Sequence, residues 1–126
     1  TLPGRLQQQQ DAFSQTGGLH ASALFDQQGS ILSLFEDVGR HNALDKLIGS
    51  ELQNNNLPLF QSGLILSGRT SFELIHKAAL AGIPVVVSIG APSSLAVDAA
   101  WEYEITLAGF LQADRFNIYS FPRRIN

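Results

Sequence analysis

The stretch around which the chain is organised spans residues 36–46 and has the sequence EDVGRHNALDK, in which seven of eleven side chains are polar or charged. Apolar residues recur from Ala43 to Ile48 at the spacing of one helix face, and Gly39 can end a preceding strand. The first turn of the predicted helix therefore combines unpaired backbone N–H groups, the positive end of the helix dipole and several side-chain donors. This combination is typical of an anion-binding site.

A purely structural interpretation also fits this stretch. In that interpretation Asp37 caps the helix, while Arg40 and Lys46 are solvated. His41 and Asp45 then form an ordinary surface pair, worth only a few tenths of a kcal/mol. Because charged residues are common at helix starts, the stretch alone leaves both interpretations open.

Length and composition predict one ordinary domain over residues 1–126. Of the 126 residues, 44% are hydrophobic and 15% are charged, and no apolar run approaches the roughly 20 residues of a membrane span. The net charge of −3 gives no overall attraction to nucleic acid or membranes, so anion binding must come from a local cluster. We therefore expect a soluble, cytoplasmic protein with no nucleic-acid and no membrane partner.

The absence of cysteine excludes several kinds of chemistry for this chain. Without cysteine it cannot form a disulfide, a cysteine-ligated zinc site or a catalytic thiolate. The histidines at 20, 41 and 76 lack metal-ligand spacing, and no serine lies in a Gly-x-Ser-x-Gly motif. We therefore predict no metal ligated by this protein and assign no catalytic residue. The chain begins at Thr1 without a signal-peptide pattern, and the simplest explanation is a processed chain or a piece of a longer one.

Periodicity predicts alternating strands and helices after an N-terminal hairpin. The expected helices cover residues 6–14, 40 to 49 or 52, 70–81 and 94–103, and the expected strands cover residues 19–25, 31–35, 63–67, 84–89, 105–110 and 116–119. Thr70 and Glu73 match a capping box at the start of the third helix. The residues expected to face inward from that helix are Phe72, Ile75 and Ala79. A polar loop is expected over residues 111–115.

Two short apolar runs, residues 64–66 and 85–87, predict interior strands covered on both faces. With the alternation of strands and helices, they predict an α/β fold, a three-layer α/β/α domain with a mixed sheet and helices on both faces. Ligands bind at the carboxyl ends of strands in such folds. Three loops at those positions, residues 36–42, 67–71 and 111–115, each contain one arginine. We therefore predict that Arg40, Arg69 and Arg115 lie in one cleft suited to a phosphate or diphosphate.

Taken together, these motifs resemble the FdhD family of formate dehydrogenase accessory sulfurtransferases. The resemblance rests on TGGLHA at residues 16–21, the stretch at 36–46, SGRTSFE at 67–73 with Lys77, and the segments LAV at 95–97 and LAGF at 107–110. It extends over nearly the whole chain, and the block at 36–46 is highly specific. The chain resembles the C-terminal, cofactor-binding part of the family.

The resemblance implies a function, a fold and partners. Members of the family take sulfur from a cysteine desulfurase and pass it to the molybdenum cofactor, bis-molybdopterin guanine dinucleotide, before its insertion into formate dehydrogenase. The cofactor is thus bound as a substrate. A cytidine-deaminase-like α/β/α fold and a homodimer are also implied. The family's cofactor contact segment corresponds to Phe110, Leu111, Gln112, Ala113, Asp114 and Arg115. The other candidate cofactor-binding residues are His20, Gly39, Arg40, His41, Asn42, Ser67, Gly68, Arg69 and Ser71.

Two departures from the family pattern shape the alternatives. The family's sulfur-carrying Cys-x-x-Cys loop is absent from this chain, and Gln112 stands where a basic residue is usual. A non-catalytic guanine-nucleotide or anion-binding module is therefore the alternative function. A zinc deaminase fits poorly, because residues 20–22 lack the required glutamate and residues 92–95 lack both cysteines.

Overall fold

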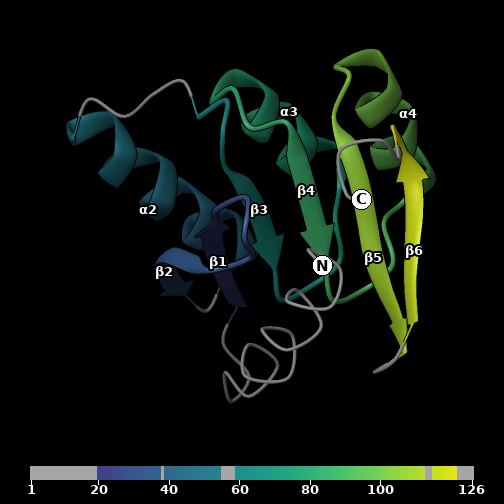
Figure 1. The fold of residues 1–126 in the computed structure, drawn as a ribbon, viewed down its shortest axis with the longest axis horizontal. Coiled ribbons are helices and arrows are strands. Elements are labelled where there is room, and N and C mark those ends of the chain that lie inside the picture. Colours follow the sequence, from purple (N-terminus) through teal and green to yellow (C-terminus); the bar gives the residue numbers. More distant parts are fainter. Residues whose placement is uncertain (1–19, 38, 55–58, 113–114, 122–126) are drawn as a thin grey trace.

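The structure of the protein is a computed structural model that describes residues 20–37, 39–54, 59–112 and 115–121 (Figure 1). At residues 40, 41, 110–112, 115 and 116 only the backbone is described. The strands are β1 (His20–Phe25), β2 (Ile31–Asp37), β3 (Gly63–Leu66), β4 (Val85–Ser88), β5 (Thr106–Gln112) and β6 (Arg115–Ser120), and the helices are α2 (Arg40–Gln53), α3 (Phe72–Leu80) and α4 (Ser94–Glu102). None of these described helices is long and apolar enough to cross a membrane. The helix predicted at residues 6–14 lies outside the described residues.

The predicted hairpin forms between β1 and β2 because the intervening turn is closed by local hydrogen bonds. The carboxylate of Asp26 accepts the N–H groups of Gln28 and Ser30, each at 2.9 Å. Gly29 has φ of 84°, which other residues rarely adopt. The hairpin therefore delivers the chain to Asp37, directly before α2.

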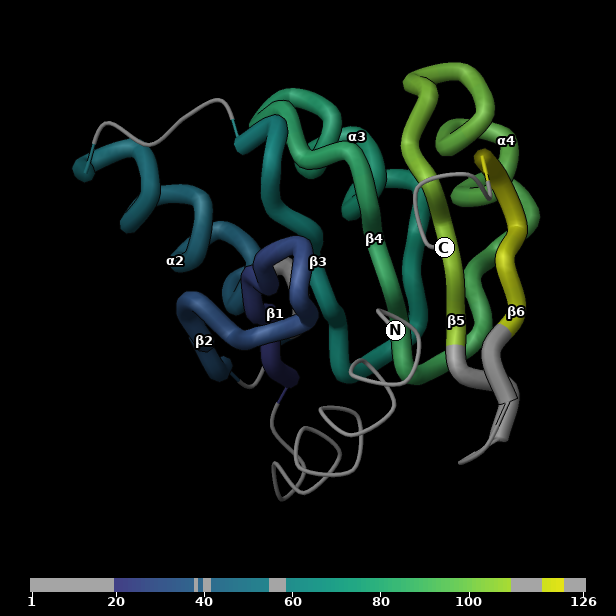
Figure 2. Tube along the Cα trace, in the orientation of Figure 1, coloured from purple at the N-terminus to yellow at the C-terminus, as the bar shows by residue number. Residues whose placement is uncertain are grey.

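The six strands form one mixed sheet in the order β2-β1-β3-β4-β5-β6 (Figure 2). β3, β4 and β5 are parallel, β1 is antiparallel to both β2 and β3, and β6 is antiparallel to β5. β2 therefore runs in the same direction as β3. As a result, the ends of β2, β3, β4 and β5 and the starts of β1 and β6 lie along one side of the sheet, which we call the carboxyl edge.

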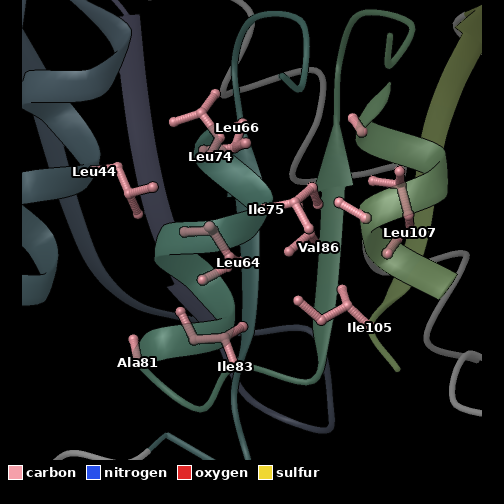
Figure 3. Close-up of a cluster of buried hydrophobic side chains, with 14 of the residues drawn as sticks. Leu44, Leu64, Leu66, Leu74, Ile75, Ala81, Ile83, Val86, Ile105 and Leu107 are labelled. Atoms are coloured by element: carbon pink, nitrogen blue, oxygen red, sulfur yellow. The ribbon is translucent and has the colours of Figure 1, made fainter. Parts of the chain in front are cut away.

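The main core lies between one face of the sheet and all three described helices (Figure 3). Leu44 of α2, Ile75 of α3 and Ala99 of α4 are each at most 2% exposed and pack in one cluster with side chains of the sheet. Helix α2 connects β2 to β3, α3 connects β3 to β4, and α4 connects β4 to β5, and each connection crosses the sheet in the same direction. Because such crossovers are right-handed, the three helices lie on the same face of the sheet. Every residue of β3 and β4 is buried, which confirms the two predicted interior strands.

The opposite face of the sheet has its own apolar cluster. Its buried members are Ala21, Ala23, Phe25, Ile65, Val85, Val87 and Ala108. None of the described helices contributes a residue to this cluster. The predicted α/β fold with a mixed sheet is thus confirmed. The described helices cover one face, so a helix layer on the second face stays a prediction.

Helix α3 begins one residue later than predicted. Ser71 is the N-cap, and its hydroxyl accepts the N–H of Leu74 at 3.3 Å, whereas Thr70 is turned inward and is only 1% exposed. The buried face of α3 also differs from the prediction. The buried residues of α3 are Leu74, Ile75 and Ala78. The predicted inward orientation of Phe72 is therefore wrong, because this side chain is 43% exposed, and Ala79 is only partly buried.

The polar loop predicted at residues 111–115 is also wrong. β5 continues to Gln112 and β6 begins at Arg115, because the two strands pair antiparallel as a hairpin. Only residues 113 and 114, which lie outside the described residues, separate the two strands. Backbone pairing in this hairpin overrides the loop-like composition of the segment.

Candidate anion-binding site at the carboxyl edge

The carboxyl edge brings the start of β1 into contact with the segments that follow β2 and β3. His20 is the register partner of Asp37, the last residue of β2. The N–H of Ala21 donates to Ser67 Oγ at 2.8 Å, and the Ser67 N–H donates to the Ala21 carbonyl oxygen at 3.1 Å. A Cβ added at Gly68 would lie 3.4 Å from His20 Nδ1. Asp37, His20 and Gly68 therefore follow one another along this edge.

The loops after β3 and β4 are joined by two backbone hydrogen bonds. The N–H of Gly90 donates to the carbonyl oxygen of Gly68 at 3.3 Å, and the N–H of Ser93 donates to that of Thr70 at 3.0 Å. These bonds connect the entrance of α3 to the entrance of α4. The two loops thus pack together as one part of the carboxyl edge.

Arg69 lies across the loop that follows β4. Its Nε–H donates to the carbonyl oxygen of Ala91 at 3.3 Å, and a Cβ added at Gly90 would lie 2.9 Å from Arg69 Cγ, so glycine is needed for this close approach. The side chain is exposed, and among the described residues no other hydrogen bond of its guanidinium is present. Arg69 can therefore offer forked N–H donors to a phosphate.

The three helices that begin at this edge differ in their caps. Ser71 accepts the N–H of Leu74 at 3.3 Å, and Ser93 accepts the N–H of Ala96 at 3.1 Å. The N-cap of α2 is Gly39, and no described side chain caps its first turn, which also contains no acidic residue. Helix α2 therefore presents unpaired N–H groups and the positive end of its dipole at the carboxyl edge.

Asp37 is the centre of a small network at the start of α2. Its Oδ1 accepts the N–H of Gly39 at 3.0 Å, and its Oδ2 lies 2.7 Å from the ammonium Nζ of Lys46. Lys46 Nζ also donates to the carbonyl oxygen of Glu36 at 3.2 Å. The hydrogen bond from Lys46, followed by those from Gly39 and the Asn42 side chain, lowers the pKa of Asp37 from 3.8 to about 2. The capping role of Asp37 in the structural interpretation is therefore wrong, whereas the side chain of Lys46 is 51% exposed and forms an ion pair with Asp37.

Asp45 belongs to a different contact. Its Oδ1 lies 2.9 Å from Lys77 Nζ, which also donates to Oδ2 at 3.2 Å. This pair connects α2 with α3. The partner of Asp45 thus comes from a neighbouring helix, whereas the side chain of His41, its expected surface partner, lies outside the description.

The predicted cofactor-binding residues fall into three groups. Those at the carboxyl edge are His20, Gly39, Asn42, Ser67, Gly68, Arg69 and Ser71. Those whose backbone alone is described at this edge are Arg40, His41, Phe110, Leu111, Gln112 and Arg115. Those outside the described residues are Ala113 and Asp114. The segments with the three arginines thus reach one edge, while the meeting of their guanidinium groups in one cleft stays a prediction.

Thr70 contributes a feature that the sequence did not indicate. Its hydroxyl is buried and has no hydrogen-bond partner among the described residues, although buried hydroxyls are nearly always bonded. The sequence interpretation had assigned this hydroxyl to the helix cap. The adjacent Ser71, which has equivalent capping chemistry, is the N-cap instead.

Comparison with known proteins decides the family. The sequence profile of the FdhD/NarQ family matches residues 1–126. The chain belongs to this family. The resemblance deduced from the sequence motifs is therefore confirmed.

The similar curated proteins are longer than this chain. The sulfur carrier protein FdhD of Streptomyces coelicolor is 55% identical over 98% of this chain and 44% of its own length. The protein of the same name from Sulfolobus acidocaldarius is 46% identical over 100% of this chain and 50% of its own length. The chain thus spans about half the length of these FdhD proteins.

Solved structures support the same fold. A crystal structure of a formate dehydrogenase accessory protein from Desulfotalea psychrophila matches with a TM-score of 0.83 and 29% identity, covering 97% of this chain and 57% of that one. Guanine deaminase from Nitrosomonas europaea matches with a TM-score of 0.59 and 12% identity, covering 86% of this chain and 74% of that one, which indicates the fold alone. The expected deaminase-like α/β fold is confirmed.

Proposed function

We propose that this chain is the cofactor-binding part of a formate dehydrogenase accessory protein. In this role it holds the guanine nucleotide end of bis-molybdopterin guanine dinucleotide, as a substrate, during sulfur transfer. Membership of the FdhD/NarQ family and the similarity to proteins named sulfur carriers support the proposal. The structural observation that favours it most is the uncapped start of α2, which lies at the same edge as Arg69.

The described residues supply the donors that a diphosphate requires. The first-turn N–H groups of α2 can bind phosphate oxygens, helped by the helix dipole. The guanidinium of Arg69 can add forked, charge-assisted hydrogen bonds. These groups bind and orient an anion, and none of them is a nucleophile for sulfur.

The sulfur must therefore be carried elsewhere. This chain has no cysteine, so it has no thiolate to form a persulfide. We include in the proposal that a cysteine desulfurase supplies the sulfur, that formate dehydrogenase receives the cofactor in the cytoplasm, and that the accessory protein acts as a homodimer. In this scheme the chain contributes cofactor binding alone.

The alternative is a non-catalytic module that binds guanine nucleotides or anions in general, and the same donors support it. A zinc deaminase has no comparable support. The chain has no cysteine, and among the described residues no group of three His, Asp or Glu could hold a metal ion. The deaminase-like fold is therefore not accompanied by the residues of deaminase chemistry.

Thermal unfolding in the presence of nucleotides tests the proposed binding. We expect guanosine diphosphate to raise the melting temperature progressively with its concentration, as mass action requires, and adenosine diphosphate to raise it less. Equal shifts with both nucleotides would favour the general anion module. No shift with either would contradict nucleotide binding by this chain.

Sulfur labelling tests the division of roles. A cysteine desulfurase with radiolabelled cysteine sulfur is incubated with this chain and, as a positive comparison, with the full-length Streptomyces coelicolor FdhD protein. We expect label on the longer protein and none on this chain. Label on this chain would overturn the conclusion drawn from its composition, and an unlabelled longer protein would contradict the sulfur-carrier assignment.

A further inference from the structure

The network around Asp37 places a negative charge beside the helix start to which we assign anion binding. An isolated carboxylate there would repel a phosphate. The structure instead places the ammonium of Lys46 2.7 Å from Asp37, so the two charges offset one another. The side chain of Asp37 is only 17% exposed, whereas that of Lys46 is 51% exposed. Asp37 is thus an enclosed acceptor rather than a solvated surface charge.

Lys46 reaches backwards from the second turn of α2 to the end of β2. Its ammonium contacts the carboxylate of Asp37 at 2.7 Å and the carbonyl oxygen of Glu36 at 3.2 Å. Two of the three N–H donors of the Lys46 ammonium therefore bond to residues at the end of β2 and are not offered to a ligand.

The other contacts of Asp37 fix the turn between β2 and α2. Its Oδ1 accepts the N–H of Gly39 at 3.0 Å, and the nearby Asn42 side chain helps to lower its pKa. A Cβ added at Gly39 would lie 3.4 Å from Asn42 Nδ2 and 3.9 Å from Asp37 Oδ1, which is ordinary van der Waals contact. The bonds to Asp37 thereby set the direction in which α2 leaves the sheet.

We infer that Asp37 and Lys46 are positioning residues, which hold the β2–α2 turn so that the uncapped first turn of α2 can bind a phosphate group of the ligand. This inference rests on the proposed function for its ligand. The pair itself does not touch the phosphate. It fixes the turn, and it cancels the charge that Asp37 alone would direct against an anion.

The direction in which Asp37→Asn changes the affinity for guanosine diphosphate distinguishes a positioning role of Asp37 from a purely electrostatic one. If Asp37 were only a neighbouring negative charge, Asp37→Asn would strengthen the binding of guanosine diphosphate. We expect the opposite, a loss of affinity of about tenfold. Lys46→Met should weaken binding by a similar factor, and the double variant should be no weaker than either single variant, because both changes disrupt one unit.

Calorimetric titration of these variants has a matched control in Asp45→Asn. Asp45 is also an aspartate of this region paired with a lysine, at 2.9 Å, but its partner is Lys77 of α3. This control should leave the affinity for guanosine diphosphate unchanged, and Lys46→Arg should restore most of the affinity lost in Lys46→Met. Unchanged or tighter binding by Asp37→Asn would overturn the inference, as would additive losses in the double variant.

Hydrogen exchange in the ligand-free protein provides a measurement that does not depend on nucleotide binding. Amides of residues 39–45 should exchange faster in Asp37→Asn and Lys46→Met than in the unchanged protein, and those of α3 should not. Unchanged exchange at residues 39–45 would overturn the positioning role, even if no nucleotide binds. Faster exchange without nucleotide binding by the unchanged chain would refute the proposed anion site and, with it, the assignment of the turn to a ligand.

Discussion

Helix α2 and helices α3 and α4 begin at the same edge of the sheet, yet their first turns are completed differently. Ser71 and Ser93 cap α3 and α4 with their hydroxyl groups, whereas Gly39 offers α2 no side-chain cap. A possible acceptor, Asp37, lies only two residues before Gly39, but its carboxylate contacts the N–H of Gly39 and the ammonium of Lys46 instead of the first turn of α2. We propose that two of the helix starts serve the stability of the fold and that the start of α2 is available for an anion.

The largest effect that would test this comparison is expected at Arg69. Arg69→Ala should weaken the binding of guanosine diphosphate by about 1.5–3 kcal/mol, the range for a charge-assisted hydrogen bond. This corresponds to roughly ten- to a hundredfold in the dissociation constant, measured by calorimetry. Arg69→Lys keeps the positive charge but loses the forked pair of N–H donors, so its affinity for guanosine diphosphate should lie between those of the unchanged protein and Arg69→Ala. An unchanged constant in Arg69→Ala would exclude the contact.

A smaller effect is expected where a cap is removed. Ser93→Ala should lower the free energy of unfolding by about 1 kcal/mol, because the N–H of Ala96 loses its acceptor. Its affinity for guanosine diphosphate should not change. Urea unfolding and calorimetry together check both expectations. A loss of affinity without a loss of stability would show that the α4 start also binds the ligand and would break the distinction between the helices.

Gly39→Ser would give α2 a serine N-cap like those of α3 and α4. Gly39→Ser should weaken the binding of guanosine diphosphate by about 0.5–1.5 kcal/mol, because the new hydroxyl occupies an N–H group that otherwise binds the anion. Gly39 has φ of −108°, so serine fits the backbone without strain. Gly39→Ala adds the same Cβ without an acceptor and is the matched control, expected to bind normally. Equal losses in the two variants would attribute the effect to packing instead of capping.

The smallest effect concerns the loss of the negative charge of Asp37 at acid pH. Its pKa is lowered from 3.8 to about 2 in the folded protein, chiefly by Lys46, so its contribution to stability is present above pH 3.8 and is lost as the pH falls towards 2. The difference in unfolding free energy between the unchanged protein and Asp37→Asn should therefore stay constant above about pH 5 and shrink below about pH 4. Urea unfolding across this range checks the expectation. A difference that grows on acidification would contradict the assigned shift.

The elements of the fold were predicted where local pattern and tertiary packing agree. The apolar runs of β3 and β4 contain no polar interruption, so only an interior position suits them. The turn of the first hairpin was predictable from Asp26 and Gly29, whose turn chemistry is local. The convergence of the loop segments at one edge followed from the order of strands and helices.

The wrong predictions lie where the sequence allows two local structures of similar stability and contacts distant in the sequence decide which one forms. Thr70 and Ser71 can both cap a helix, and the choice of Ser71 depends on the burial of Thr70 in the folded domain. The segment at residues 111–115 was predicted to be a loop, but residues 111 and 112 belong to β5 and Arg115 belongs to β6, and these two strands pair as a hairpin. The pairing of Lys46 with Asp37 spans the end of β2 and the second turn of α2, so it depends on an angle between elements that sequence spacing does not determine.

The central claim is that the start of α2, unlike those of α3 and α4, binds the phosphate groups of a guanine nucleotide. The most direct measurement is a titration of the isotope-labelled protein with guanosine diphosphate, followed by the NMR shifts of its backbone amides. We expect the largest shifts at residues 39–43 and 68–70, with the capped amides of Leu74 and Ala96 nearly unaffected. Shifts of equal size at the three helix starts, or none at α2, would contradict the account.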